Sequence, residues 1–203
     1  MTWNEINLKQ YSELLKVDTK QDPIDYAADV IRILFKVDDP LSLSMPEFNK
    51  YSEEIKIIGT EIPDVKLKDT YKVNGHEYVL DGNVFEWSMS QLIDFRKYSA
   101  KSELADIVAC YIIPKDHKYN DGYDMEEVIN DVNALPITDV MKMQSFFVQG
   151  AWMSINIMVD YLQSTLKKTK APELQKKLAF LKTLINDLQT NTTSFLTSSH
   201  IAK

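Results

Sequence analysis

Cysteine, histidine and glycine are all scarce in this chain of 203 residues. The single cysteine, Cys110, excludes an intrachain disulfide and any zinc or iron–sulfur site built from several thiolates of one chain. The histidines, His76, His117 and His200, are too scattered to indicate a metal cluster. With five glycines the chain has no G-x-G-x-x-G motif and no Walker A loop for phosphate groups. We therefore expect that the protein uses no metal and no cofactor.

Positive charge is also in short supply. The chain has 23 lysines and arginines against 30 aspartates and glutamates, which gives a formal net charge of −7. DNA and anionic membranes attract proteins with a dominant positive surface. The most apolar stretch, residues 144–159, contains polar side chains and is shorter than the roughly 20 apolar residues that span a bilayer. We expect no secretion signal at the N-terminus, because its first residues lack the basic and apolar regions of one. We expect no sequence-specific nucleic acid and no membrane among its partners.

Most of the chain has the apolar spacing of amphipathic helices. Capping residues mark several helix starts: Asp22 precedes Pro23, and Ser44 lies three residues before Glu47. Asp124 is expected to cap a later helix, and Thr138 the longest one. The spacing predicts helices over 7–17, 23–38, 45–58, 88–98, 102–113, 125–134, 139–168 and 172–189.

The middle of the chain has the alternating pattern of strands. Residues 70–73 and 76–80 flank Asn74-Gly75, a dipeptide that favours a two-residue hairpin turn because both positions need positive φ. Val65 and Leu67 alternate with lysines and are expected to add a third strand. The predicted fold is mainly α: a helical domain with a small β-hairpin insertion and a long C-terminal helical hairpin. We divide it into an N-terminal helical segment (1–62), the hairpin (63–85) and a C-terminal helical region (86–203), which together form one compact domain.

The predicted helix over 139–168 is apolar on most of its circumference, so it should be buried on all sides. One chain of this size has difficulty surrounding such a helix, so we expect contacts between subunits. Four of its methionines are interpreted as core, with an adaptable binding surface as the alternative; they are Met141, Met143, Met153 and Met158.

The polar loop 115–123 contains the residues that come nearest to a calcium-binding or catalytic pattern. Aligning Gly122 with the glycine of an EF-hand loop places His117 at the first and Val128 at the last ligand position, where calcium needs oxygen ligands. His117 beside acidic residues could form an acid–base cluster, but no nucleophile is nearby; the acidic residues are Asp116, Asp121 and Asp124. We interpret the loop as a solvated connector.

Other candidate residues have simple structural interpretations. Cys110 is expected to be a small buried hydrophobe, and His76, just after the hairpin turn, is expected to be exposed and not to act as a ligand. We therefore predict no catalytic, cofactor-binding or metal site.

Several loop and cap patterns, taken in order, resemble small structural and assembly proteins of tailed phages of gut Bacteroidetes, including crAss-like phages. The resemblance covers roughly Asn4 to Lys168 and not the last helix or the tail. It rests on the segments Asn4 to Tyr11, Tyr71 to Tyr78, Ile112 to Asp124 and Leu135 to Asp139.

The resemblance implies a non-enzymatic virion protein that assembles in the cytoplasm of a bacterial host. It would associate with itself into a ring, and with other phage structural proteins, at the head–tail junction or tail. One alternative is a tail-assembly chaperone that is absent from the mature particle. Another, from a different class, is a small enzyme that uses the His117 loop.

Overall fold

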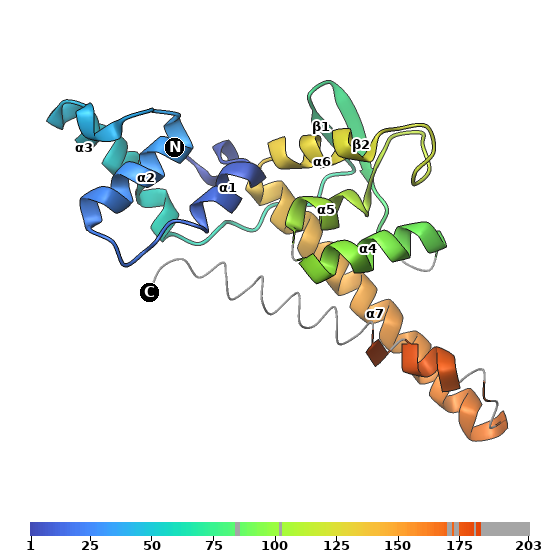
Figure 1. Cartoon of the computed structure of the whole chain (residues 1–203). Helices are drawn as coiled ribbons and strands as arrows, with labels where there is room; N and C mark the ends of the chain where they lie inside the picture. Colours follow the sequence, from blue (N-terminus) through green and yellow to red (C-terminus); the bar gives the residue numbers. More distant parts are fainter. Residues whose placement is uncertain (84–85, 102, 170–171, 173–174, 181, 184–203) are drawn as a thin grey trace.

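The computed structural model describes residues 1–83, 86–101, 103–169, 172, 175–180 and 182–183. As predicted, the fold is mainly helical with a small β-sheet (Figure 1). The elements in chain order are η1 (Trp3–Glu5), α1 (Leu8–Leu14), α2 (Pro23–Phe35), η2 (Pro40–Ser42), α3 (Met45–Glu54), η3 (Ile55–Gly59), β1 (Thr70–Val73), β2 (His76–Leu80), α4 (Met89–Lys101), α5 (Leu104–Ala109), β3 (Ile112–Pro114), α6 (Met125–Ala134) and α7 (Ile137–Thr169).

Helix starts follow the predicted caps closely. The Asp22 carboxylate accepts a hydrogen bond from the Ile24 backbone N–H at 2.8 Å, and Ser44 forms a capping box with Glu47. Asp124 caps α6 through the Glu126 N–H at 2.9 Å. A side-chain oxygen at this position satisfies an N–H group that has no partner within the helix.

The sheet contains a third strand that differs from the predicted one. The hairpin has the predicted two-residue turn, with φ of 49° at Asn74 and 88° at Gly75. The prediction of a strand at Val65 and Leu67 is wrong, because these residues have no regular structure. Instead β3 pairs antiparallel with β2, giving the order β1-β2-β3.

This third strand shortens the helix predicted over 102–113. Helix α5 ends at Ala109, and Ile112 and Ile113 are then extended, with 0% and 6% of their surfaces exposed. Both residues are β-branched, and Ile113 precedes a proline, which disfavours helical backbone. Burial between β2 and the helices therefore favours a strand here.

Helix α7 crosses the molecule and extends beyond α4 (Figure 1). It starts at Ile137, so the prediction that Thr138 caps it is wrong; the Thr138 hydroxyl donates instead to the Asn4 side chain at 2.6 Å. The prediction that the helix is buried on all sides is also wrong for this single chain. Ile157 and Tyr161, in the extending half, have 65% and 66% of their surfaces exposed.

The other half of α7 enters the core through an aromatic stack. The Phe147 ring lies parallel to that of Tyr111, with centroids 4.3 Å apart and an interplanar angle of 4°. On its other side it stacks on Trp87 at 5.2 Å. Met143, one turn earlier, is fully buried, as the core interpretation predicted. The stack fixes α7 against the segments before α4 and β3.

Part of the helix predicted over 172–189 lies within the described residues. Residues 175–180 are helical, and the Arg96 guanidinium of α4 lies 5.7 Å from the centre of the Phe180 ring. Residues 172 and 182–183 are helical as well, whereas residues 173–174, 181 and 184–189 of the predicted helix, the tail 190–203 and the side chains of Met153 and Met158 lie outside the described residues. Within the described residues, no helix has the length and apolarity needed to cross a membrane.

Candidate functional site

A buried carboxylate, Asp131, joins the hairpin to α6. Only 3% of its surface is exposed. Oδ1 accepts a hydrogen bond from Asn74 Nδ2 at 2.7 Å, and Oδ2 accepts one from the Tyr78 hydroxyl at 2.5 Å. His76 Nδ1 lies 2.7 Å from Oδ2 and donates when it carries the proton. We call these four residues the Asp131 cluster.

Local structure places each member of the cluster. Asp131 lies three residues after Val128 and one before Val132, both buried, so it belongs to the buried face of α6. His76 and Tyr78 are two residues apart in β2 and therefore lie on one face of the sheet. The turn then brings the third donor, the Asn74 amide, to the same carboxylate.

Hydrogen bonding sets the charges in the cluster. Burial alone would raise the pKa of Asp131, but the hydrogen bonds from Tyr78, His76 and Asn74 outweigh it and lower that pKa below its ordinary value. The hydrogen bond to Asp131 raises the pKa of His76. Burial, and next the bond to Asp131, raises the pKa of Tyr78. The cluster thus favours an ionised Asp131 beside a neutral Tyr78.

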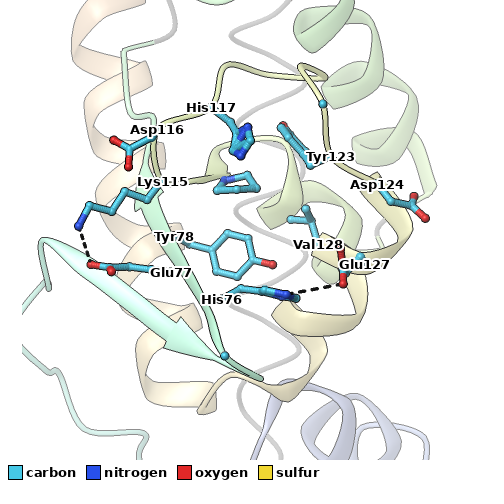
Figure 2. A pocket seen from close by; sticks show the side chains of 13 residues that line it. His76, Glu77, Tyr78, Lys115, Asp116, His117, Tyr123, Asp124, Glu127 and Val128 are labelled. Carbon is cyan, nitrogen blue, oxygen red and sulfur yellow. Dashed lines mark hydrogen bonds and ion pairs between the residues drawn. The ribbon is translucent and has the colours of Figure 1, made fainter.

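Two members of the cluster, His76 and Tyr78, line an open pocket of about 640 Å³ (Figure 2). His76 Nε2 lies 3.7 Å from Glu127 Oε1 at one end, and the Lys115 ammonium lies 3.2 Å from Glu77 on the side. His117 lies across the Tyr78 ring from His76 in the same view. His76 and His117 therefore line the same pocket, and Figure 2 shows the Tyr78 ring between them.

The side-chain contacts of His117 differ from those of the acid–base cluster considered in the sequence analysis. His117 Nδ1 lies 3.2 Å from the backbone carbonyl oxygen of Asp121, and its ring meets the Tyr123 ring edge-on at 6.0 Å. The loop is held in place elsewhere, because the Tyr119 hydroxyl donates to Asp94 of α4 at 3.0 Å.

Cys110 is fully buried, as its interpretation as a small hydrophobe predicted. Burial raises the pKa of its thiol to about 12, which disfavours the reactive thiolate. His76 is exposed, as predicted. Its side chain is 44% exposed, yet it contacts both Asp131 and Glu127.

Sequence reasoning missed Asp131 altogether. A usable signal was present, since a carboxylate on the apolar face of a helix needs partners to be buried. His76 shares the alternating face of Tyr78, which is the second signal.

The Asp131 cluster connects the hairpin to α6 and fixes the orientation of His76. The carboxylate orients His76 and leaves Nε2 towards the pocket, where it can exchange a proton with solvent. The described residues that line the pocket include no serine, threonine or cysteine that His76 could activate. Among the described residues, no group of three or more histidine, cysteine or acidic side chains is placed to hold a metal ion.

Comparison of the chain with family models, curated proteins and solved structures finds no match.

Proposed function

We propose that the protein is a non-enzymatic structural component of a tailed-phage particle. In this role it associates with copies of itself into a ring at the head–tail junction or in the tail, where it also contacts other phage structural proteins. Assembly takes place in the cytoplasm of the bacterial host, and the protein then stays in the virion. The sequence resemblance described above supports the phage context.

The assembly proposal rests on the exposed apolar side chains in the C-terminal half of α7, the part that extends beyond α4. Ile157 and Tyr161 are four residues apart, so they lie on the same side of the helix. Both are large and mostly exposed, although most such side chains gain by burial. Burying one of them against a neighbour contributes about 1.5–3 kcal/mol, which favours association.

The Asp131 cluster supports the same role because it makes the rest of the subunit rigid. Its hydrogen bonds connect a two-stranded hairpin, which is marginal by itself, to a helix. A rigid body that presents a projecting helix is suited to repeated contacts between subunits.

The alternative is a tail-assembly chaperone, which would use the same exposed helix to hold another phage protein and then leave. Peptide mass spectrometry on purified particles of the encoding phage distinguishes the two. Peptides of this protein in stoichiometric ratio to known tail proteins support the virion role. Their presence in infected cells and absence from particles would favour the chaperone.

A further inference from the structure

The turn of the hairpin carries the only Asn-Gly pair in the sequence. Asn74 and Gly75 are both exposed, and no heavy atom lies within 4 Å of the position where a Gly75 Cβ would be. Since Gly75 has no side chain and the space beside it is open, its backbone nitrogen is not shielded. A nitrogen next to an asparagine side chain, without steric shielding, can attack the side-chain amide carbon.

We propose that Asn74 is a site of spontaneous covalent modification and that its hydrogen bond to Asp131 controls the rate. The Gly75 nitrogen loses its proton to hydroxide and attacks Asn74 Cγ. A nitrogen–carbon bond forms, the Cγ–Nδ2 bond breaks, and Nδ2 takes a proton from water and leaves as ammonia, which regenerates hydroxide. Water then adds to one of the two carbonyl carbons of the five-membered imide, and the bond from that carbon to the imide nitrogen breaks while the nitrogen takes a proton. The products are aspartate and isoaspartate at position 74, and no oxidant or reductant takes part.

The folded hairpin restrains this reaction. Attack requires the Asn74 side chain to turn towards the Gly75 nitrogen, whereas Nδ2 lies 2.7 Å from Asp131 Oδ1. The pairing of Val73 with His76 also closes the turn. The reaction therefore proceeds from a locally opened hairpin, and its rate follows the population of that open state.

Modification would in turn weaken the connection between the hairpin and α6. The amide is a hydrogen-bond donor to Asp131, whereas a carboxylate at position 74 is an acceptor of the same charge as Asp131. The isoaspartate product also adds an atom to the backbone of a two-residue turn, whose geometry depends on its length. Each modified chain thus loses one of the donors that hold Asp131.

Asn120 provides an internal control. It is exposed and has a positive φ of 59°, as Asn74 does, but it is followed by Asp121 and not by glycine. A reaction that depends on the unshielded glycine nitrogen should spare it.

The test is peptide mapping by mass spectrometry during incubation of the folded protein in mildly alkaline buffer. We expect Asn74 to convert to acid forms while Asn120 stays an amide. Asp131→Ala should convert several-fold faster than the wild type. Tyr78→Phe removes another hydrogen bond to Asp131 but retains the Asn74 contact, so it controls for general loss of stability and should convert more slowly than Asp131→Ala.

Two results would overturn the proposal. The first is an Asn74 amide that lasts as long as that of Asn120. The second is a rate that Asp131→Ala raises no more than Tyr78→Phe does. Circular dichroism on each variant checks that the reaction is measured on folded protein. If Asp131→Ala does not fold, Asp131→Leu replaces it in the same comparison.

Discussion

His76 and Asp131 are 55 residues apart in the sequence, and His76 Nδ1 lies 2.7 Å from Asp131 Oδ2. This contact joins the hairpin to α6, and the Tyr78 hydroxyl reaches the same oxygen. A carboxylate that is buried and accepts several hydrogen bonds is stable only while its donors stay in place.

Replacing Asp131 should therefore destabilise the protein strongly. Asp131→Ala leaves the buried Tyr78 hydroxyl without its acceptor, and we expect a loss of about 2–4 kcal/mol in the free energy of unfolding. Urea denaturation measures it. Asp121→Ala, at an exposed position of the loop, is the matched control and should change stability by less than about 0.5 kcal/mol. Equal effects of the two substitutions would show that the cluster contributes little.

The same contact predicts a pH dependence. The raised pKa of His76 means that its contribution is fully present below its unfolded pKa of about 6.5 and is lost as pH rises through the folded pKa. The lowered pKa of Asp131 means that its contribution is present above its unfolded pKa of about 3.9 and is lost as pH falls through the folded pKa.

The cluster should thus stabilise the protein most between about pH 4 and pH 6.5. Urea denaturation from about pH 4 to well above pH 6.5, for the wild type and for His76→Gln, gives the difference in unfolding free energy at each pH. We expect this difference to shrink on the alkaline side. A difference that does not vary with pH would contradict a titrating His76–Asp131 contact.

How far the sequence predicted the fold depends on the range of the interactions. The caps at Asp22, Ser44 and Asp124 were predictable because each depends on side chains within three residues of the helix start. The hairpin was predictable from Asn74-Gly75 for the same reason.

The interactions that were missed link distant segments. Strand β3 forms because β2 is available some thirty residues earlier in the chain, a partner that local propensity does not reveal. Asp131 was missed because the prediction of α6 rested on its cap and its apolar residues alone. Its donors come from the hairpin, and only the tertiary structure brings them together.

The turn itself gives a third prediction. Gly75 has a φ of 88°, a conformation in which a β-branched residue is strained, so Gly75→Val should cost about 1–3 kcal/mol. Gly59 is the control, because its φ is not in that region and a Cβ there meets no atom within 4 Å. Thermal unfolding of Gly75→Val and Gly59→Val makes the comparison. A Gly75→Val protein as stable as the wild type would contradict the observed turn.

The aromatic stack gives a fourth prediction. Phe147 is 1% exposed between Tyr111 and Trp87, and Phe147→Ala should cost about 3–5 kcal/mol because it leaves a cavity between two rings. The neighbouring Phe146 is 43% exposed, so Phe146→Ala should cost far less. Urea denaturation followed by tryptophan fluorescence reports both. If both variants unfold at the same urea concentration, the stack does not anchor α7.

The fifth prediction concerns the exposed side of α7. Replacing Ile157 and Tyr161 together by serine should weaken self-association, because it removes apolar area that a neighbouring subunit would bury. The matched control replaces Ile24 and Met45, which are 59% and 72% exposed on α2 and α3, by serine as well. This control should associate as the wild type does.

Light scattering after size-exclusion chromatography, over a range of micromolar concentrations, tests the proposed assembly most directly. We expect the wild-type mass to rise with concentration above that of one chain, and the α7 variant to stay closer to the mass of one chain. A wild-type protein that keeps the mass of a single chain at every concentration and binds no dye specific for apolar surfaces would contradict assembly through α7.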